Sequence, residues 1–186
     1  MTFEKEYCMA IYFIRHGESV FNATFKGTID PMIFDAPLTK LGLAQATRAR
    51  DSASRLGITR VITSPFTRAI QTAQTIFDGI SPIEVQHGHH ELLLHSCDIG
   101  RPPNELKVDF PNLVFDHLPR SWWHENNNTA LEIAKEPIEF FQKRISKFVA
   151  SLNKIDNETI AIVGHGNAFR EIIGFELTNC QIHQFR

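Results

Sequence analysis

Three short apolar segments, each followed at once by reactive side chains, constrain the fold of this chain most. Residues 9–14 read Met-Ala-Ile-Tyr-Phe-Ile, residues 60–63 read Arg-Val-Ile-Thr, and residues 159–163 read Thr-Ile-Ala-Ile-Val. Apolar runs of this length are typical of strands that are buried on both faces, as in a parallel sheet. The sequence therefore predicts a central sheet that is covered on both sides.

The segments between these strands have the apolar periodicity of helices. Apolar residues recur there at intervals of three and four, which places them on one helical face. We expect Thr39 to cap the first of these helices and Gly57 to end it, and residues 83–85 to form a weak further strand. Strands that alternate with helices indicate an α/β fold: a three-layer domain with a mostly parallel central sheet flanked by helices. The predicted helices cover residues 43–56, 66–77, 138–152 and 168–175.

The chain of 186 residues has the length of one domain. It contains no internal repeat, no low-complexity run and no linker. Residues 88–128 lack clear periodicity and contain prolines at 102, 103, 111 and 119. We expect residues 1–186 to form a single domain in which residues 88–128 are a variable insertion on the substrate side.

Composition argues against several functional classes. Nineteen Lys and Arg residues against 21 Asp and Glu residues give a net charge of −2, without the basic excess of a nucleic-acid or anionic-membrane binder. No apolar run approaches the roughly 20 residues of a membrane span. The N-terminus lacks the layout of a secretory signal, and Cys8, Cys97 and Cys180 form no CxxC pair. We expect a reduced, soluble, cytoplasmic protein without nucleic-acid or membrane partners, of unspecified oligomeric state.

Reactive side chains follow the three predicted strands. Arg15 and His16 come directly after the first, Ser64 ends the second with Arg68 four residues later, and His165 follows the last. Ligands of open α/β sheets bind beyond the carboxyl ends of the strands, so these residues are expected to converge. The arginine fork matches phosphate oxygens, and neither a P-loop nor a dinucleotide motif is present. The sequence therefore predicts a phosphate site built from side chains.

The residue types also indicate a reaction. The sequence has no obvious set of metal-binding carboxylates, so we expect neither a metal nor another cofactor. Phosphoryl transfer then requires a nucleophile, cations and an acid for the leaving group. His16 suits the nucleophile, because neighbouring guanidinium groups push the pKa of its imidazole below about 6.5 and favour the neutral form. Glu91 is the first candidate for the acid and Asp98 the second.

Residues 15–22, Arg-His-Gly-Glu-Ser-Val-Phe-Asn, resemble the signature of the histidine phosphatase superfamily, which is also called phosphoglycerate mutase-like. The similarity continues in residues 35–46, in the Ser-Pro-Phe-Thr-Arg-Ala segment that starts at residue 64, and in residues 163–166. Residues 97–100, Cys-Asp-Ile-Gly, resemble a less-characterised branch from plants and fungi, and Phe21 stands where the mutases usually have Trp.

The resemblance implies a metal-independent enzyme with a phosphoglycerate mutase-like fold. His16 would carry the phosphoryl group and Glu91 would be the proton donor. Asn22 would assist at the edge of the phosphate, and Asn167 is a further candidate for contact with substrate. The phosphoryl group itself would be bound by Arg15, Arg68 and His165.

Three functions remain open at this point. The first is a phosphatase that hydrolyses a small phosphorylated substrate through a phosphohistidine. The second is a mutase that returns the phosphoryl group to another hydroxyl, and the third is a non-catalytic phosphate-binding module. The scarcity of cations between residues 91 and 165 favours the phosphatase.

Two further clusters have ordinary and functional interpretations. His87, His89, His90 and His95 suggest a metal site, but without ligand-like spacing we expect solvated histidines or histidines at a pocket rim. Trp122 and Trp123 form either an aromatic wall over the substrate or ordinary packing of the insertion.

Overall fold

A five-stranded sheet forms the centre of the protein, whose computed structural model describes residues 9–125 and 133–186. The strand order is β3-β2-β4-β1-β5, and only β5 runs antiparallel to its neighbour. The predicted, mostly parallel sheet is therefore confirmed, whereas the short, polar β5 was not predicted. The strands are β1 (Ala10–Arg15), β2 (Arg60–Thr63), β3 (Ile83–Val85), β4 (Thr159–Gly164) and β5 (Ile182–Gln184).

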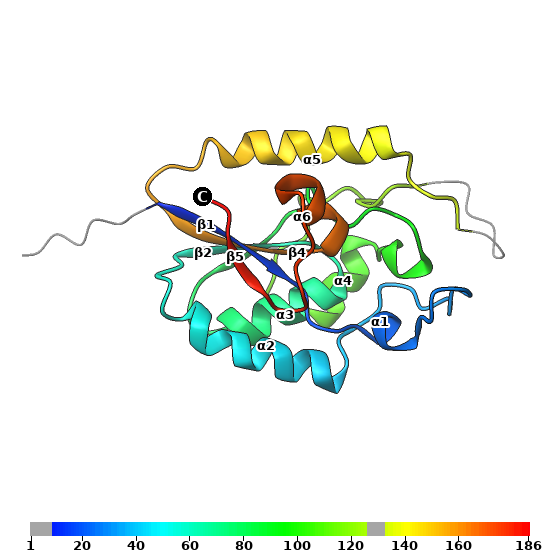
Figure 1. The fold of residues 1–186 in the computed structure, drawn as a ribbon, viewed down its shortest axis with the longest axis horizontal. Coiled ribbons are helices and arrows are strands. Elements are labelled where there is room, and N and C mark those ends of the chain that lie inside the picture. The colour runs from blue at the N-terminus through cyan, green and yellow to red at the C-terminus, as the bar shows by residue number, and fades with distance from the viewer. Residues whose placement is uncertain (1–8, 126–132) are drawn as a thin grey trace, which may run out of the picture.

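Helices cover both faces of this sheet, as Figure 1 shows. Every predicted helix and strand starts and ends within three residues of the expected limits; α6 begins two residues earlier than expected, directly after His165. The helices are α1 (Val20–Thr24), α2 (Lys40–Ala53), α3 (Thr67–Phe77), α4 (Pro103–Asp109), α5 (Ile138–Leu152) and α6 (Gly166–Ile173). A 3-10 turn, η1 (Ser96–Asp98), and α4 lie between β3 and residue 125, in a segment that is otherwise irregular.

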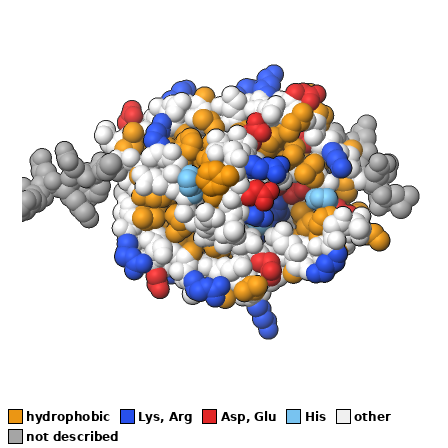
Figure 2. All heavy atoms as spheres, in the orientation of Figure 1, with side chains coloured by type: hydrophobic (Ala, Val, Ile, Leu, Met, Phe, Trp, Pro, Cys, Tyr) orange, Lys and Arg blue, Asp and Glu red, His pale blue; other side chains and the backbone are white. Residues whose placement is uncertain are grey.

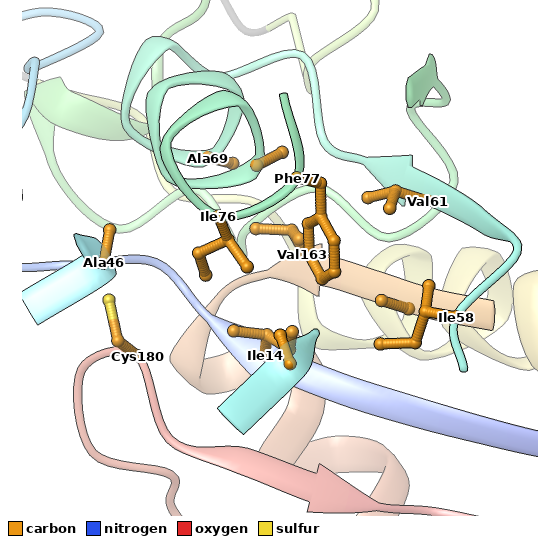
Figure 3. Close-up of a cluster of buried hydrophobic side chains, with 12 residues drawn as sticks. Ile14, Ala46, Ile58, Val61, Ala69, Ile76, Phe77, Val163 and Cys180 are labelled. Atoms are coloured by element: carbon orange, nitrogen blue, oxygen red, sulfur yellow. The ribbon is translucent and has the colours of Figure 1, made fainter. Parts of the chain in front are cut away.

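The two faces of the sheet pack against different helices. Ile14 on β1 faces the cluster formed with α2 and α3, which Figure 3 shows in close-up. Its neighbour Phe13 points to the other face and stacks on Phe169 of α6, with ring centroids 4.7 Å apart. Because successive side chains of a strand alternate in direction, a strand covered on both faces must be apolar throughout. This explains the continuous apolar runs in the sequence.

The register of strand pairing aligns the carboxyl ends of β1, β2 and β4, which the reactive residues follow. Arg15 lies opposite Gly164 in the β1–β4 pair, and Thr63 lies opposite Val163 in the β2–β4 pair. The backbone N–H of His16 then donates to the carbonyl oxygen of Gly164 at 2.9 Å. The residues that follow β1, β2 and β4 therefore meet at the carboxyl edge of the sheet.

Local sequence signals account for the ends of α2 and α6. The Thr39 hydroxyl accepts a hydrogen bond from the Gly42 N–H at 2.9 Å, which confirms the expected cap. At the end of α6, Gly174 adopts a left-handed conformation with φ of 82°, which favours glycine.

Within residues 9–125 and 133–186, none of the helices has the length and apolar character to cross a membrane.

The Trp122 side chain belongs to the core. Its ring packs edge-on against Phe66 at a centroid distance of 4.7 Å, and its Nε1 donates to the Arg101 carbonyl oxygen at 2.8 Å. The residue is only 2% exposed. Of the two interpretations of this aromatic pair, packing of the insertion onto the domain is therefore the correct one for Trp122.

Candidate active site

His16 is placed just beyond β1 and is only 4% exposed. Its Nδ1 lies 2.7 Å from the carbonyl oxygen of Gly17. Because a carbonyl oxygen only accepts, Nδ1 carries the ring hydrogen and Nε2 keeps a free lone pair. Burial, followed by the charges of Arg68 and Arg15, lowers the pKa of His16 well below its ordinary value. The ring is therefore neutral at physiological pH and has its nucleophilic nitrogen available.

His165 lies beside His16 at the start of α6. The centroids of the two imidazole rings are 5.3 Å apart. The Nε2 of His165 is 2.8 Å from the Ser64 hydroxyl, and its buried Nδ1 has no hydrogen-bond partner among the described residues. When Ser64 donates to Nε2, the ring hydrogen resides on Nδ1 and is free to bind an oxygen of a ligand.

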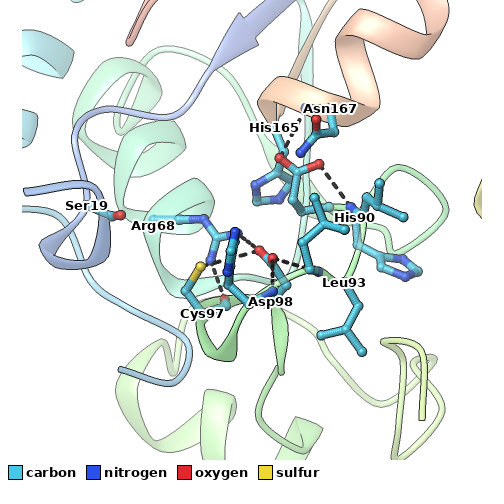
Figure 4. Close-up of polar contacts among 12 residues, drawn as sticks. Ser19, Arg68, His90, Leu93, Cys97, Asp98, His165 and Asn167 are labelled. Carbon is cyan, nitrogen blue, oxygen red and sulfur yellow. Dashed lines mark hydrogen bonds and ion pairs between the residues drawn. The ribbon is translucent and has the colours of Figure 1, made fainter. Parts of the chain in front are cut away.

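Arg68 extends from the first turn of α3 into the same region, as Figure 4 shows. It is 2% exposed, and its charge is felt by both His16 and His165. Nη1 donates to the Cys97 carbonyl oxygen at 2.7 Å, and Nη2 forms a 3.1 Å ion pair with Asp98. A buried guanidinium is thus held in one orientation next to the two imidazoles.

Arg15 approaches the site from the end of β1. Its Nη1 donates to the Leu177 carbonyl oxygen at 2.6 Å, while its buried Nε has no partner in the part of the chain that the structure describes. A Cβ atom at Gly166 would lie 3.3 Å from the guanidinium carbon. A glycine at the first position of α6 therefore lets the helix N-terminus lie close against this arginine.

Glu91 is buried at the N-terminus of α6, close to Asn167, which Figure 4 labels. Its Oε2 accepts from the Asn167 N–H at 3.1 Å, and its Oε1 accepts from the N–H groups of Leu92 and Ala168 at 2.9 and 3.2 Å. Burial, and next the negative charge of Asp98, raise the pKa of Glu91. A carboxyl group with a raised pKa keeps its proton to a higher pH than an exposed one, which suits it to act as an acid.

The two asparagine candidates are placed at the margin of this cluster. Asn22 is exposed, and its Oδ1 accepts from the backbone N–H and the hydroxyl of Ser19 at 3.1 and 3.0 Å, which caps α1. Asn167 is half-buried, and its Oδ1 accepts from Arg170 at 3.3 Å. Contact of either side chain with phosphate stays a prediction.

Sequence reasoning named Ser64 without giving it a role, and it missed two further residues that support the site. The Ser64 hydroxyl orients His165, and the Asn179 side chain donates to the His16 carbonyl oxygen at 2.8 Å. A Cβ atom at Gly42 would lie 2.1 Å from the Glu18 carbonyl oxygen, so α2 packs directly on the loop that carries His16. The family segments quoted above contain Ser64 and Gly42, but no sequence signal pointed to Asn179.

The histidine cluster differs in part from expectation. His89 is 0% exposed and therefore not solvated, whereas His90 is 5% exposed but lines a pocket together with His87. His89 donates from Nε2 to the Val163 carbonyl oxygen at 3.1 Å and stacks on Phe148. Among residues 9–125 and 133–186, no group of three His, Cys, Asp or Glu side chains is arranged to hold a metal ion. His89 instead belongs to the packing of α5 onto the sheet.

Buried neutral histidines predict a loss of stability at low pH. Burial lowers the pKa of His89 to about 4, whereas the unfolded chain has a histidine pKa of about 6.5. Between these values the unfolded state binds more protons, so stability is complete above pH 6.5 and declines as the pH falls. For His89 alone we expect a loss of about 2 kcal/mol between pH 7 and pH 5.

Urea unfolding at the two pH values measures this loss. The variant His89→Gln is expected to lose less stability on acidification than the wild-type protein, because one titrating group has been removed. An equal loss of stability on acidification in His89→Gln and in the wild-type protein would contradict a neutral, buried His89.

Comparison with known proteins places the chain in the family whose motifs its sequence resembles. Residues 11–186 match the histidine phosphatase superfamily, branch 1. The chain is 26% identical to phosphoglycerate mutase-like protein 1 of Arabidopsis thaliana, over 85% of this chain and 68% of that protein. It is 38% identical to the probable phosphoglycerate mutase GpmB of Cronobacter sakazakii, but that match covers 59% of this chain and 43% of the mutase.

Solved structures share the fold. A putative α-ribazole-5′-P phosphatase from Escherichia coli superposes with a TM-score of 0.65 at 19% identity, covering 95% of this chain and 90% of that chain. A phosphoserine phosphatase from Entamoeba histolytica, in complex with 3-phosphoglyceric acid, superposes with a TM-score of 0.63 at 23% identity, covering 96% and 91%. At these identities the likeness establishes the fold.

Proposed function

This chain belongs to the histidine phosphatase superfamily, and on that premise we propose that it hydrolyses phosphate monoesters through a phosphohistidine on His16. One observation carries the proposal. The imidazole of His16, whose Nε2 lone pair is free, lies beside that of His165, with ring centroids 5.3 Å apart. Arg15 directly precedes His16 in the chain, and both Arg15 Nε and His165 Nδ1 are buried without a partner among the described residues. A nucleophile among unsatisfied donors is the arrangement that a transferring phosphoryl group requires.

In the first step, His16 Nε2 attacks the phosphorus in line with the leaving oxygen. The N–P bond forms as the P–O bond to the leaving group breaks, and Glu91 gives its proton to that oxygen. Arg15, Arg68 and His165 neutralise the charge on the other phosphoryl oxygens. The hydrogen bond from Nδ1 to the Gly17 carbonyl oxygen stabilises the positive charge that the imidazole acquires.

In the second step, water replaces the leaving group. Glu91, now a carboxylate, takes one proton from this water as its oxygen attacks phosphorus. The N–P bond breaks, inorganic phosphate leaves, and His16 returns to its neutral form. The substrate we infer is a small phosphorylated molecule, the class represented by the 3-phosphoglyceric acid in the Entamoeba phosphatase complex.

Identification of the covalent intermediate tests this mechanism. The protein is mixed with a panel of phosphorylated metabolites, quenched at alkaline pH, digested and examined by mass spectrometry, while free phosphate is assayed in parallel. We expect a transient phosphoryl group on the peptide that contains His16 and release of inorganic phosphate. Transfer to a second hydroxyl without phosphate release would establish the mutase alternative. Absence of both an adduct and phosphate release across the panel would favour the binding module.

A further inference from the structure

Asp98 is the one carboxylate among the described residues that forms an ion pair with Arg68. It lies at the end of η1 and is 4% exposed. Its Oδ1 accepts from Arg68 Nη2 at 3.1 Å, and its Oδ2 accepts from the backbone N–H groups of Leu94 and His95 at 3.2 and 3.1 Å. Both of its oxygens are therefore occupied, and the side chain has a single defined position.

We propose that Asp98 is a positioning residue that acts through two catalytic groups: it fixes the orientation of the Arg68 guanidinium, and its negative charge keeps Glu91 in the protonated form. This inference rests on the proposed function. It also changes the role of Asp98, which the sequence offered as the second candidate for the proton donor. A proton on Asp98 would weaken its ion pair with Arg68, whereas a proton on Glu91 breaks no ion pair.

Asp98 fixes the orientation of Arg68 through hydrogen bonds to the planar guanidinium group. One N–H of Nη1 is bound by the Cys97 carbonyl oxygen, and one N–H of Nη2 is bound by Asp98. These two contacts anchor one edge of the planar group and leave its remaining N–H groups for phosphoryl oxygens. The Phe66 ring, 4.3 Å below the guanidinium carbon, supports the same orientation.

Asp98 affects the protonation of Glu91 because some neighbouring groups favour the charged form of this carboxyl group and others favour its neutral form. Three backbone N–H groups favour the charged form of Glu91, while burial and Asp98 favour the neutral form. Burial also raises the pKa of Asp98, but Arg68 and two backbone N–H groups favour its charged form. The first proton that this pair of carboxyl groups takes up therefore resides on Glu91. Other titratable or charged groups around the pair are Cys97 and His95 at η1, which contact Asp98, and Arg144 from α5, which donates to the Glu91 carbonyl oxygen. Arg68 from α3 also acts on His16 and His165.

The variant Asp98→Asn tests the inference with two substrates that differ in their leaving groups. An aryl phosphate such as p-nitrophenyl phosphate has a leaving group that departs without a proton, whereas an alkyl phosphate requires one. We expect kcat for the alkyl phosphate to fall about ten-fold more than kcat for the aryl phosphate. We also expect the alkaline limb of the kcat/KM profile to move about one pH unit lower, because the acid form of Glu91 is lost earlier.

A double-mutant cycle separates action through Glu91 from a structural effect. In a Glu91→Gln background, Asp98→Asn is expected to cause no further difference between the two substrates, because the proton it controls is already absent. Asp35→Asn is the matched control, since Asp35 is also buried and forms a 2.8 Å ion pair with Arg101 outside the site. Circular dichroism and thermal unfolding establish that each variant is folded.

The outcomes distinguish the inference from the proposed function. Equal losses for both substrates together with an unshifted alkaline limb would overturn the control of the Glu91 proton by Asp98, and unchanged kinetics for both substrates would overturn its positioning of Arg68 as well. The same leaving-group effect in Asp35→Asn would also overturn it, because the effect would then not be specific to this pair. If the wild-type protein hydrolyses neither substrate and forms no phosphohistidine, the proposed function itself fails.

Discussion

Replacing His16 with alanine is expected to abolish turnover, by about four orders of magnitude or more, and to leave the fold intact. The side chain supplies the nitrogen that would receive the phosphoryl group, and no neighbouring group replaces it. The only hydrogen bond of this side chain in the described structure joins it to the adjacent Gly17, so its removal breaks no hydrogen bond between distant segments. Phosphate release under saturating substrate measures the effect, and thermal unfolding checks the fold.

The histidine on β5 provides a matched control for this experiment. His183 pairs with Phe13 across the sheet and stands outside the cluster around His16. The variant His183→Ala is expected to keep turnover within a few-fold of the wild-type value. Wild-type turnover in the His16→Ala variant would show that the nucleophile has been assigned incorrectly.

Replacing Arg68 with alanine is expected to affect both stability and activity. The change leaves the Asp98 carboxylate buried without its cation, and breaking a buried ion pair in this way costs about 3 kcal/mol or more. It also removes the proposed donor to the transferring phosphoryl group, for which we expect kcat to fall about a thousand-fold. Urea unfolding and steady-state kinetics measure the two losses separately.

A double variant separates these two roles of Arg68. Arg68→Met combined with Asp98→Leu removes both charges and replaces them with apolar side chains, so no carboxylate remains buried without a partner. We expect most of the stability to return, because replacing a buried pair by apolar groups is often neutral. Activity should stay low, since no guanidinium is present. Recovery of activity in this double variant would contradict direct binding of phosphate by Arg68.

The fold was largely predictable because its signals are local. Apolar runs marked β1, β2 and β4, the Thr39 hydroxyl marked the start of α2, and periodicity marked α5. The strand β5 has no such signal, because its three residues are stabilised by pairing with β1 and not by their own composition. The burial of His89 and His90 was missed for a related reason: burial depends on which helix packs above a segment, and α5 lies some 50 residues further along the chain.

The site was predictable in part for a topological reason. Parallel strands end at the same edge of a sheet, so the order of the elements already implied that Arg15, His16, Arg68 and His165 would meet. Figure 2 shows that, on the face it presents, acidic and basic side chains are interspersed, in keeping with the small net charge of the sequence. A near-neutral composition is therefore compatible with a buried cationic cluster, because such a cluster needs only a few residues.

The sequence by itself determined which side chains are available and at which edge of the sheet they gather, because strand periodicity and strand order are properties of the chain. Only the tertiary structure decided their partners. It joined Asp98 to Arg68, placed the Glu91 carboxylate at the N-terminus of α6 and set Ser64 against His165. These contacts link segments that lie 30 to 101 residues apart. Their distances and burial set the charge state of each group, and no local pattern encodes either quantity.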